Sequence, residues 1–564
     1  MTATLKGQPA GGALGGLWQR QLEHYPETRP RVLYLAIVVL ATIILYYELY
    51  IAGAVAPSII SGFGMTFPFY VYITVVGNAI GAFGSLAAGL ADRWGRANMV
   101  AYGLLVTGAL TLFGIPNASG KWTFAILFYL IGLVEGVILV ATPALVRDFS
   151  PQLGRASAMG FWTLGPVVGS LVVSVVSSNT VGSLHPWQDQ FIICGIVGLV
   201  VGVIAIFGLR ELSPQLRDQL MVSLRDRALI EAKARGLDIT ESLKRPWRQM
   251  MRLDVIGSAF AISVFLIIYY TAVGFFTIYF TSIHGFSLSQ ANGLGNWFWA
   301  FDAGALIVVG IISDKLGVRK PFMVIGAVGA IVMTIVFLNL GAGTSLGTFA
   351  LVISLNAVFL AIAYGPWMAS FTETVEKHNP ALTATGLAVW GWIIRAVVAI
   401  SIAILPVVIS AMTPLVTYGT PVATLSAKYA PQLQTLGAVD AQTLGTLQAN
   451  PADAAAGAKA VGEIATALKI SPADATARLI AVSKVPKGDL LFLQAHGPAV
   501  QKAAADAPGQ WKAWWWVCVG GEVAFLPFIL VMAGRWSPRR AREDQAEHER
   551  AVEAELAALQ AEKA

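Results

Sequence analysis

Charged residues are scarce in this 564-residue chain. Asp, Glu, Lys and Arg together make up 12% of it, whereas a soluble globular domain carries about 25%. Apolar residues make up 56%, and the mean hydropathy is +0.67. A water-soluble protein of this composition could not cover its surface with polar groups. The composition therefore excludes a soluble enzyme, a disordered chain and a coiled coil.

Cysteines and catalytic motifs are scarce as well. Cys194 and Cys518 both lie in apolar runs, so they define neither a disulfide framework nor a zinc site. The chain has no Gly-x-x-x-x-Gly-Lys-Ser/Thr loop, which argues against ATP-driven transport, and no His-Glu-x-x-His motif. We expect no metal, no cofactor and no enzymatic activity. The net charge of +6 does not predict a nucleic-acid partner, because the basic residues lie in short clusters between apolar runs.

Long apolar runs dominate the sequence. A helix that spans a membrane needs about 20 largely apolar residues. The runs that meet this length cover residues 32–56, 67–91, 98–116, 122–145, 155–176, 190–209, 255–281, 291–313, 321–340, 348–371, 383–412 and 513–533. Six runs, a charged interlude and six more runs indicate an internal duplication. The sequence predicts an all-α polytopic membrane protein with twelve helices in two pseudo-symmetric halves.

Lys and Arg gather in every second connection, whereas the short connections of the opposite parity contribute only Lys121. Because basic loops stay on the cytoplasmic side, both termini and the central loop are predicted to be cytoplasmic, in a plasma-membrane protein. The predicted parts are a cytoplasmic tail (1–31), a six-helix bundle (32–209), a cytoplasmic loop (210–254), helices seven to eleven (255–412), an extracytoplasmic Ala-rich helical insertion (413–512), helix twelve (513–533) and a charged cytoplasmic tail (534–564). Within the insertion, residues 450–453 and 471–474 each read as a polar cap, then Pro, then an early acid, which predicts two helix starts.

A short pattern occurs twice where a run ends at the predicted cytoplasmic surface. It consists of an acid, a base, any residue, a glycine and a further base, and glycine permits a tight turn there. An acid beside several bases can form a charge network at an interface that opens and recloses. Two copies at equivalent places argue against two unremarkable basic loops. The residues of the two copies are Asp92, Arg93, Gly95 and Arg96, and Asp314, Lys315, Gly317 and Arg319.

With this layout and both copies of the pattern, the chain resembles the major facilitator superfamily of secondary transporters. The family pattern begins with glycine four residues before the acid; Gly310 matches it, whereas Ala88 departs from it. The resemblance implies that the loop acids and bases lock the cytoplasmic ends of the two halves. The eight residues of the two copies are therefore expected to act in gating rather than in substrate binding.

The fifth run contains Gly165, Pro166 and Gly169, which resemble the Gly-Pro core of an element described for antiporters of this family. The fuller pattern has a glycine where Phe161 stands. Export by antiport is one interpretation. A proline kink with glycines for close helix packing is the other.

An ionisable residue deep in an apolar run costs about 3 kcal/mol and is a functional candidate, and four such residues are singled out here. Arg395 is the first candidate for substrate binding, because its planar fork suits a carboxylate and Trp392 shares its helix face one turn away. Asp302 is a candidate for substrate binding and for proton coupling, although an ion pair with Arg395 is an alternative. Glu135 and Glu48 are candidates for proton coupling, or they are simply protonated and hydrogen-bonded.

The main hypothesis is a monomeric secondary transporter in a lipid bilayer. Its two halves would rock about a mid-membrane site, driven by protons, and carry a small organic anion such as a carboxylate. One alternative is a proton-coupled exporter of drugs or metabolites, because three buried acids outnumber one buried base. A second alternative is a membrane-anchored sensor that reads a ligand through residues 413–512.

Overall fold

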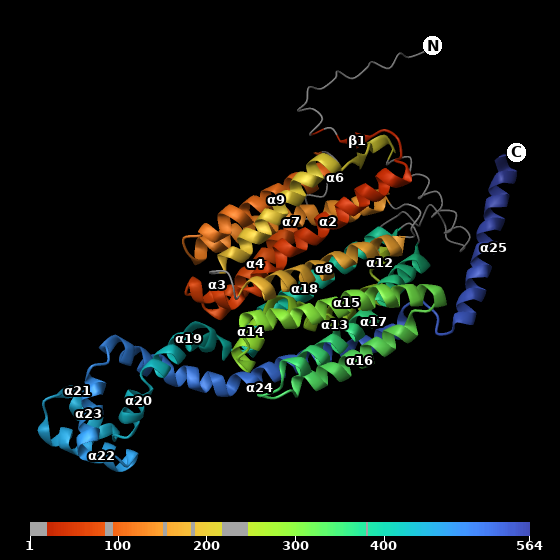
Figure 1. The fold of residues 1–564 in the computed structure, drawn as a ribbon. Helices are drawn as coiled ribbons and strands as arrows, with labels where there is room; N and C mark the ends of the chain where they lie inside the picture. The colour runs from red at the N-terminus through yellow and green to blue at the C-terminus, as the bar shows by residue number, and fades with distance from the viewer. Residues whose placement is uncertain are drawn as a thin grey trace. The chain divides into compact units, whose positions relative to one another are not determined.

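The structure is a computed structural model that describes residue 18 and residues 20–84, 94–149, 155–181, 187–216, 246–379 and 382–563. Almost all of these residues are helical (Figure 1). Eleven of the described helices are long and apolar enough to cross a membrane, and residues 164–180 add a shorter apolar helix. The predicted all-α polytopic fold is confirmed.

The eleven candidate spans and the helix that contains the shorter apolar segment fall into two sets of six. The first set is α2 (Thr28–Ala54), α4 (Phe67–Gly84), α6 (Arg96–Ala109), α7 (Lys121–Phe149), α8 (Arg155–Thr180) and α9 (Gln188–Gly208). The second set is α13 (Leu253–Phe265) continued by α14 (Ile267–His284), α15 (Leu288–Leu316), α16 (Lys320–Leu338), α17 (Leu346–His378), α18 (Thr383–Val408) and α24 (Lys487–Val531). Short elements are α3 (Ala56–Gly62), η2 (Leu110–Gly114), η3 (Ile115–Asn117) and α12 (Pro246–Met250), and α25 (Pro538–Lys563) follows the last span.

Both sets pack in the same way. In the first half α2 packs on α8, and α4 and α6 pack on α7; in the second half α13 packs on α18, and α15 and α16 pack on α17. Between the halves α8 packs on α15, α4 on α18 and α2 on α14. The contact of α8 with α15 joins the fifth span to the eighth, and the contact of α4 with α18 joins the second span to the eleventh. The two contacts are therefore equivalent when the halves are interchanged. The packing therefore has the pseudo-two-fold relation that a duplicated bundle requires.

Local sequence signals explain where individual helices begin and end. Ser287 starts α15 with a capping box: its hydroxyl accepts the N–H of Gln290, and the Gln290 side chain accepts the N–H of Ser287. The same helix ends at Gly317, whose φ of +65° suits glycine. Close helix approach also needs glycine, since a Cβ at Gly136 of α7 would collide with the carbonyl oxygen of Gly81 in α4.

One end of the bundle is marked by the two repeated loops. There, strand β1 (Gln21–Leu22) pairs in parallel with β2 (Glu211–Leu212), so the segment before α2 meets the segment after α9. The Glu211 carboxylate accepts the backbone N–H of Arg96 at 2.7 Å. We call this end, where Arg96 and Arg319 lie, the signature end. Because α2 starts there, its last residue, Ala54, lies at the opposite end.

Residues 409–510 form a separate compact unit. Its helices are α19 (Met412–Lys428), α20 (Ala430–Gly437), α21 (Ala441–Ala449), α22 (Ala454–Leu468), α23 (Pro472–Ser483) and the beginning of α24. Val439, Ala460, Ile464 and Ala475 form its apolar core.

The two helix starts predicted inside this unit fare differently. Ser471 caps α23 as predicted, with its hydroxyl accepting the N–H of Asp474. The other helix, α22, starts three residues later than predicted, because Asp453 rather than Asn450 caps it. The helix α24 begins at Lys487, well before the predicted start of the twelfth span at 513. The helix runs through Pro508 and Gly509 without a break, so the apolar run that begins at residue 513 is only the last part of a longer helix.

Candidate functional site

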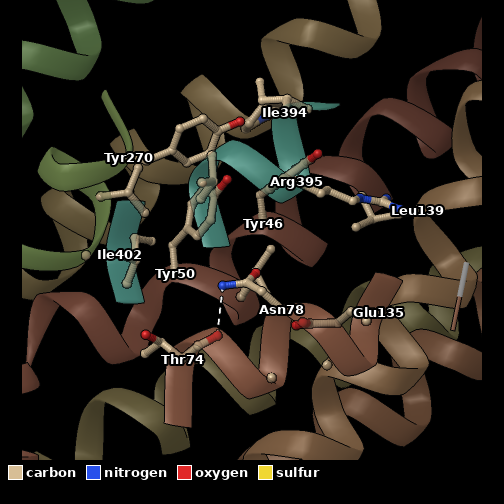
Figure 2. A pocket seen from close by; sticks show the side chains of 18 of the residues that line it. Tyr46, Tyr50, Thr74, Asn78, Glu135, Leu139, Tyr270, Ile394, Arg395 and Ile402 are labelled. Carbon is tan, nitrogen blue, oxygen red and sulfur yellow. Dashed lines mark hydrogen bonds between the residues drawn. The ribbon is translucent and has the colours of Figure 1, made fainter. Parts of the chain in front are cut away.

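A cavity of about 570 Å³ lies between the halves of the bundle. Its wall is built from α2, α4, α7 and α8 of the first half and from α14, α15, α17 and α18 of the second. The five residues that the sequence singled out for substrate or proton binding all line it: Arg395, Asp302, Trp392, Glu135 and Glu48. Figure 2 shows Arg395 with Tyr46, Tyr50 and Tyr270 in the upper part of the view, and Glu135 and Asn78 below.

Arg395 lies near the middle of α18, between the two halves. It interacts electrostatically with Tyr46 of α2 and with Tyr270 of α14, so its charge has neighbours from both bundles. Asp302 of α15 is 4% exposed and lines the same cavity. Trp392, one turn before Arg395, is half-exposed on this wall. An ion pair between Arg395 and Asp302 stays a prediction.

Two buried carboxyl groups come together in the first half. Glu48 is 4% exposed, and its Oε2 accepts a hydrogen bond from the Thr107 hydroxyl at 2.6 Å. Its Oε1 lies against Gly198, where a Cβ would collide with it. Glu135 is 1% exposed, and neither of its oxygens has a hydrogen-bond partner among the described residues. The two carboxyl groups interact electrostatically, so a proton on one changes the environment of the other.

Hydrogen bonds join the two halves at the end opposite the signature end. In each one a side chain of the second half donates to the first half, and most acceptors are backbone carbonyls of a last helical turn. The bonds are Thr277 Oγ1 to Gly53 O (2.6 Å), Asn292 Nδ2 to Ala54 O (3.0 Å), Ser289 Oγ to Ser178 O (2.5 Å) and Asn296 Nδ2 to Ser178 Oγ (2.9 Å). We call this set the inter-half contact.

Proline explains why one of these carbonyls is available. The carbonyl of Gly53 would normally accept the N–H of the residue four places on, but that residue is Pro57, which has none. The hydroxyl of Thr277 supplies the missing donor. Gly53 also lets the helices approach closely, because a Cβ there would collide with the carbonyl of Val273.

At the signature end, the first copy of the loop pattern is described in part, since Asp92 and Arg93 lie outside the described residues. Gly95 has a φ of +90° and precedes α6. Nη1 of the Arg96 guanidinium donates to both carboxylate oxygens of Asp148, to Oδ1 at 3.0 Å and to Oδ2 at 2.8 Å. Asp148 lies at the end of α7, in the same half.

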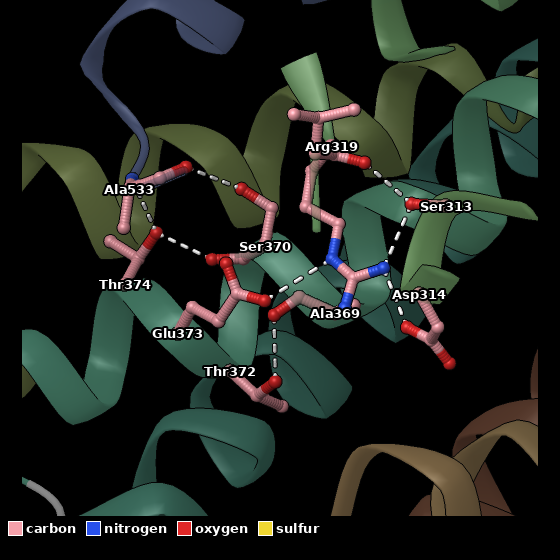
Figure 3. A network of polar contacts seen from close by, with 10 residues as sticks. Ser313, Asp314, Arg319, Ala369, Ser370, Thr372, Glu373, Thr374 and Ala533 are labelled. Atoms are coloured by element: carbon pink, nitrogen blue, oxygen red, sulfur yellow. Dashed lines mark hydrogen bonds and ion pairs between the residues drawn. The ribbon is translucent and has the colours of Figure 1, made fainter. Parts of the chain in front are cut away.

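The second copy has an equivalent arrangement (Figure 3). Arg319 contacts Asp314 at 2.6 Å, Glu373 at 3.1 Å and the Ser313 hydroxyl at 2.8 Å. Glu373 belongs to α17, the fourth span of its half, as Asp148 belongs to the fourth span of the first half. Lys315 is exposed. In this structure Arg96 and Arg319 are paired within their own halves, and the role of the loop residues in gating stays a prediction.

The fifth-span element lies where helices pack closely. A Cβ at Gly165 would stand 2.6 Å from Thr42, and a Cβ at Gly169 would stand 2.6 Å from Tyr46, both on α2. Pro166 lines the cavity. The glycines thus have a packing function, and an antiport role stays a prediction.

Several polar residues at these places escaped the sequence reasoning. Asp148, Glu211 and Glu373 sit at the ends of apolar runs, where an acid looks like part of a solvated loop. Glu522 of α24 is fully buried; its Oε1 accepts a hydrogen bond from Thr334 at 2.8 Å, and it does not line the cavity. Glu522 lies inside the twelfth apolar run, so listing every acid within the apolar runs would have identified it from the sequence.

Two six-helix bundles of equivalent packing around a mid-bundle cavity define a class of proteins, the membrane transporters built from repeated halves. A family model described as "Major Facilitator Superfamily" matches residues 38–404. The chain belongs to the Major Facilitator Superfamily. Proteins of this family are transporters rather than enzymes, and the predicted membership of the family is confirmed.

Similar proteins carry varied names. The chain is 27% identical over 313 residues to "Probable anion transporter 3, chloroplastic" of Arabidopsis thaliana, covering 54% of this chain and 57% of the relative. It is 24% identical over 289 residues to "Efflux pump radE" of Floropilus chiversii, covering 47% and 53%. The chain thus spans about half the length of the curated relatives it matches.

Solved structures share the fold. A bacterial homolog of the human lysosomal transporter Spinster, in an inward-facing and unoccupied conformation, has a TM-score of 0.56 at 16% identity, over 91% of this chain and all of that one. A D-xylose-proton symporter has a TM-score of 0.51 at 15% identity, over 66% and 89%.

Proposed function

We propose that this chain is a secondary transporter that moves a small organic anion across a membrane by alternating access, coupled to protons. The observation that carries the proposal is Arg395, a permanent cation on the wall of a cavity that both halves enclose. A guanidinium binds a carboxylate through two parallel hydrogen bonds. The curated relative named as an anion transporter supports the same class of cargo.

The carboxyl groups of the first half supply the proposed coupling site. Glu135 lines the cavity and has two oxygens without a hydrogen-bond partner among the described residues, so a proton can reach it and be held there. Buried carboxyl groups of this kind form proton relays in pumps and transporters. Glu48 is fixed by Thr107 and acts as the electrostatic neighbour of Glu135.

The two ends of the bundle supply the proposed alternation. The inter-half contact closes one end, while Arg96 and Arg319 at the signature end pair inside their own halves. We infer that this arrangement opens the cavity toward the signature end, and by the positive-inside rule we assign that end to the cytoplasmic side of a plasma-membrane monomer. In the opposite state the loop bases would exchange partners and lock the halves together.

Uptake into proteoliposomes tests the proposal. With an imposed pH gradient, a panel of radiolabelled carboxylates should include one that accumulates, and Arg395→Gln should abolish its uptake. Arg539→Gln is the control, because Arg539 is exposed on α25 and is not among the residues that line the cavity. If Arg395→Gln leaves carboxylate uptake intact, the anion site is wrongly placed.

A proton-coupled exporter is the second candidate. Three acids line the cavity, against one arginine, and such a wall also suits a cationic drug. One curated relative is named an efflux pump. A cationic dye such as ethidium separates the two candidates: in the exporter, Arg395→Gln would preserve pH-driven movement of the dye, whereas in the anion transporter the dye would not move at all.

A further inference from the structure

The cavity wall is aromatic around its basic group. Six tyrosines line it, contributed by both halves: Tyr46, Tyr50, Tyr70, Tyr269, Tyr270 and Tyr364. Tyr46 and Tyr50 pack against each other with ring centroids 5.4 Å apart, and Tyr269 and Tyr270 do so at 5.3 Å. Such rings offer large, rigid faces to a planar ligand and lose little conformational entropy when they bind it.

Two kinds of donor for an anion lie on α18. Arg395 carries a guanidinium, and Trp390 carries a buried indole Nε1–H that has no hydrogen-bond partner among the described residues; both residues line the cavity. Trp390 is 8% exposed, and a buried indole N–H normally finds an acceptor. A carboxylate bound in the cavity could serve as that acceptor, since Trp390 lines the cavity wall.

The charges on the wall limit the cargo to one negative charge. Arg395 is the one Lys or Arg among the described residues that line the cavity, and it can neutralise a single carboxylate. Glu48, Glu135 and Asp302 occupy the rest of the charged wall. A second carboxylate on the ligand would lie unpaired near these acids, in a place where water screens charges poorly.

We propose that the cargo is an aromatic monocarboxylate, with its carboxylate on Arg395 and the Trp390 N–H and its ring among the tyrosines of α2 and α14. This inference rests on the proposed function and names its substrate class. A cavity of about 570 Å³ falls within the range that holds a drug-sized ligand, so a two-ring acid fits.

Four bicyclic probes of similar size separate the contributions of the aromatic ring, the negative charge and a second carboxylate to binding. They are 2-naphthoate, decalin-2-carboxylate, 2-naphthamide and naphthalene-2,6-dicarboxylate, and binding to the purified full chain is measured by calorimetry. We expect 2-naphthoate to bind about three- to tenfold more tightly than the saturated acid, because only the aromatic ring stacks. The amide should bind at least tenfold more weakly, because it loses the charge-assisted hydrogen bonds. The dicarboxylate should also bind more weakly than 2-naphthoate.

Variants of the chain test which side chains contact the carboxylate and which contact the ring of the probe. Trp390→Phe keeps the ring and removes the N–H, so naphthoate affinity should fall about tenfold while the preference over the saturated acid stays. Trp297→Phe is the matched control, because Trp297 is exposed and does not line the cavity. Arg395→Lys keeps the charge and should retain weakened naphthoate binding, whereas Arg395→Gln should make the acid and the amide bind alike. Tyr270→Leu should reduce the preference for the aromatic acid.

Two results would overturn the proposal: equal binding of the aromatic and saturated acids, or tighter binding of the dicarboxylate. Flux measured in proteoliposomes keeps this outcome separate from the fate of the proposed function. If another carboxylate accumulates with the pH gradient while 2-naphthoate shows no preference, the substrate class is wrong and the transport proposal stands. If 2-naphthoate binds as expected but no carboxylate is ever moved, the site stands and the transport proposal fails.

Discussion

The inter-half contact can be weakened by removing its donors, and the consequence for the resting conformation can be calculated. The variant Thr277→Val/Asn292→Leu deletes the hydrogen bonds to the carbonyls of Gly53 and Ala54 while preserving much of the side-chain volume. Hydrogen bonds between membrane helices contribute about 0.6 kcal/mol on average and up to about 1.7 kcal/mol. The loss of two therefore weakens the closed end by about 1–3 kcal/mol, which shifts the ratio of closed to open states by roughly 5- to 150-fold.

A cysteine at the boundary reports the shift. Ser174 of α8 is buried and faces Gly295 of α15 across the two halves, so Ser174→Cys is reached by a soluble maleimide only when this end opens. The two native cysteines are fully buried and give a low background. In the double variant, the labelling rate of this cysteine should rise by the factor calculated above, provided that opening is fast relative to the reaction.

Controls confine the effect to the inter-half contact. Thr281→Val removes a hydroxyl one turn further along α14 that bonds to carbonyls of its own helix, so labelling should not change. Pro57→Ala should raise labelling, because the new N–H competes with Thr277 for the carbonyl of Gly53. Unchanged labelling in a folded Thr277→Val/Asn292→Leu variant would refute the role of these hydrogen bonds in closing this end.

Three further predictions concern single residues. Glu135→Gln should reduce pH-driven uptake at least tenfold yet preserve exchange of labelled for unlabelled substrate, since the amide cannot carry a proton; equal losses in both assays would contradict a coupling role. Gly198→Ala should lower the free energy of unfolding by about 1–3 kcal/mol, because its Cβ collides with the Glu48 carboxyl; denaturant titration measures this change. Gly304→Ala, which has no atom near its Cβ, should leave the free energy of unfolding unchanged. Asp440 caps α21, and hydrogen bonds with Glu463, Lys459 and Thr443 lower its pKa. Its contribution to stability is therefore complete above the unfolded carboxyl pKa of about 3.9 and is lost as the pH falls toward the folded pKa. Hydrogen exchange of α21 in Asp440→Ala should therefore be faster than in the unmodified chain at pH 7, and this difference should shrink in acid.

The sequence was sufficient for the layout of the spans, because hydropathy is a property of consecutive residues. An apolar run of about 20 residues must be a helix in lipid, where every backbone polar group needs an internal partner. The two copies of the loop pattern identified the family, and the depth of Arg395 within its run followed from counting residues at 1.5 Å each. Cap residues such as Ser471 likewise fixed a helix start from a few neighbouring residues.

Only the tertiary structure decided which polar groups meet. A helix that is apolar on every side gives no signal of which face points to which neighbour, so nothing in the chain announces that Glu48 meets Thr107 or that Arg319 meets Glu373. Those pairs depend on how each helix is rotated in the bundle, and packing against distant segments sets that rotation. The sequence thus determined the depth of charges such as Arg395 and Glu135 within their runs, whereas the packing of the helices determined which charges are buried and which groups they contact.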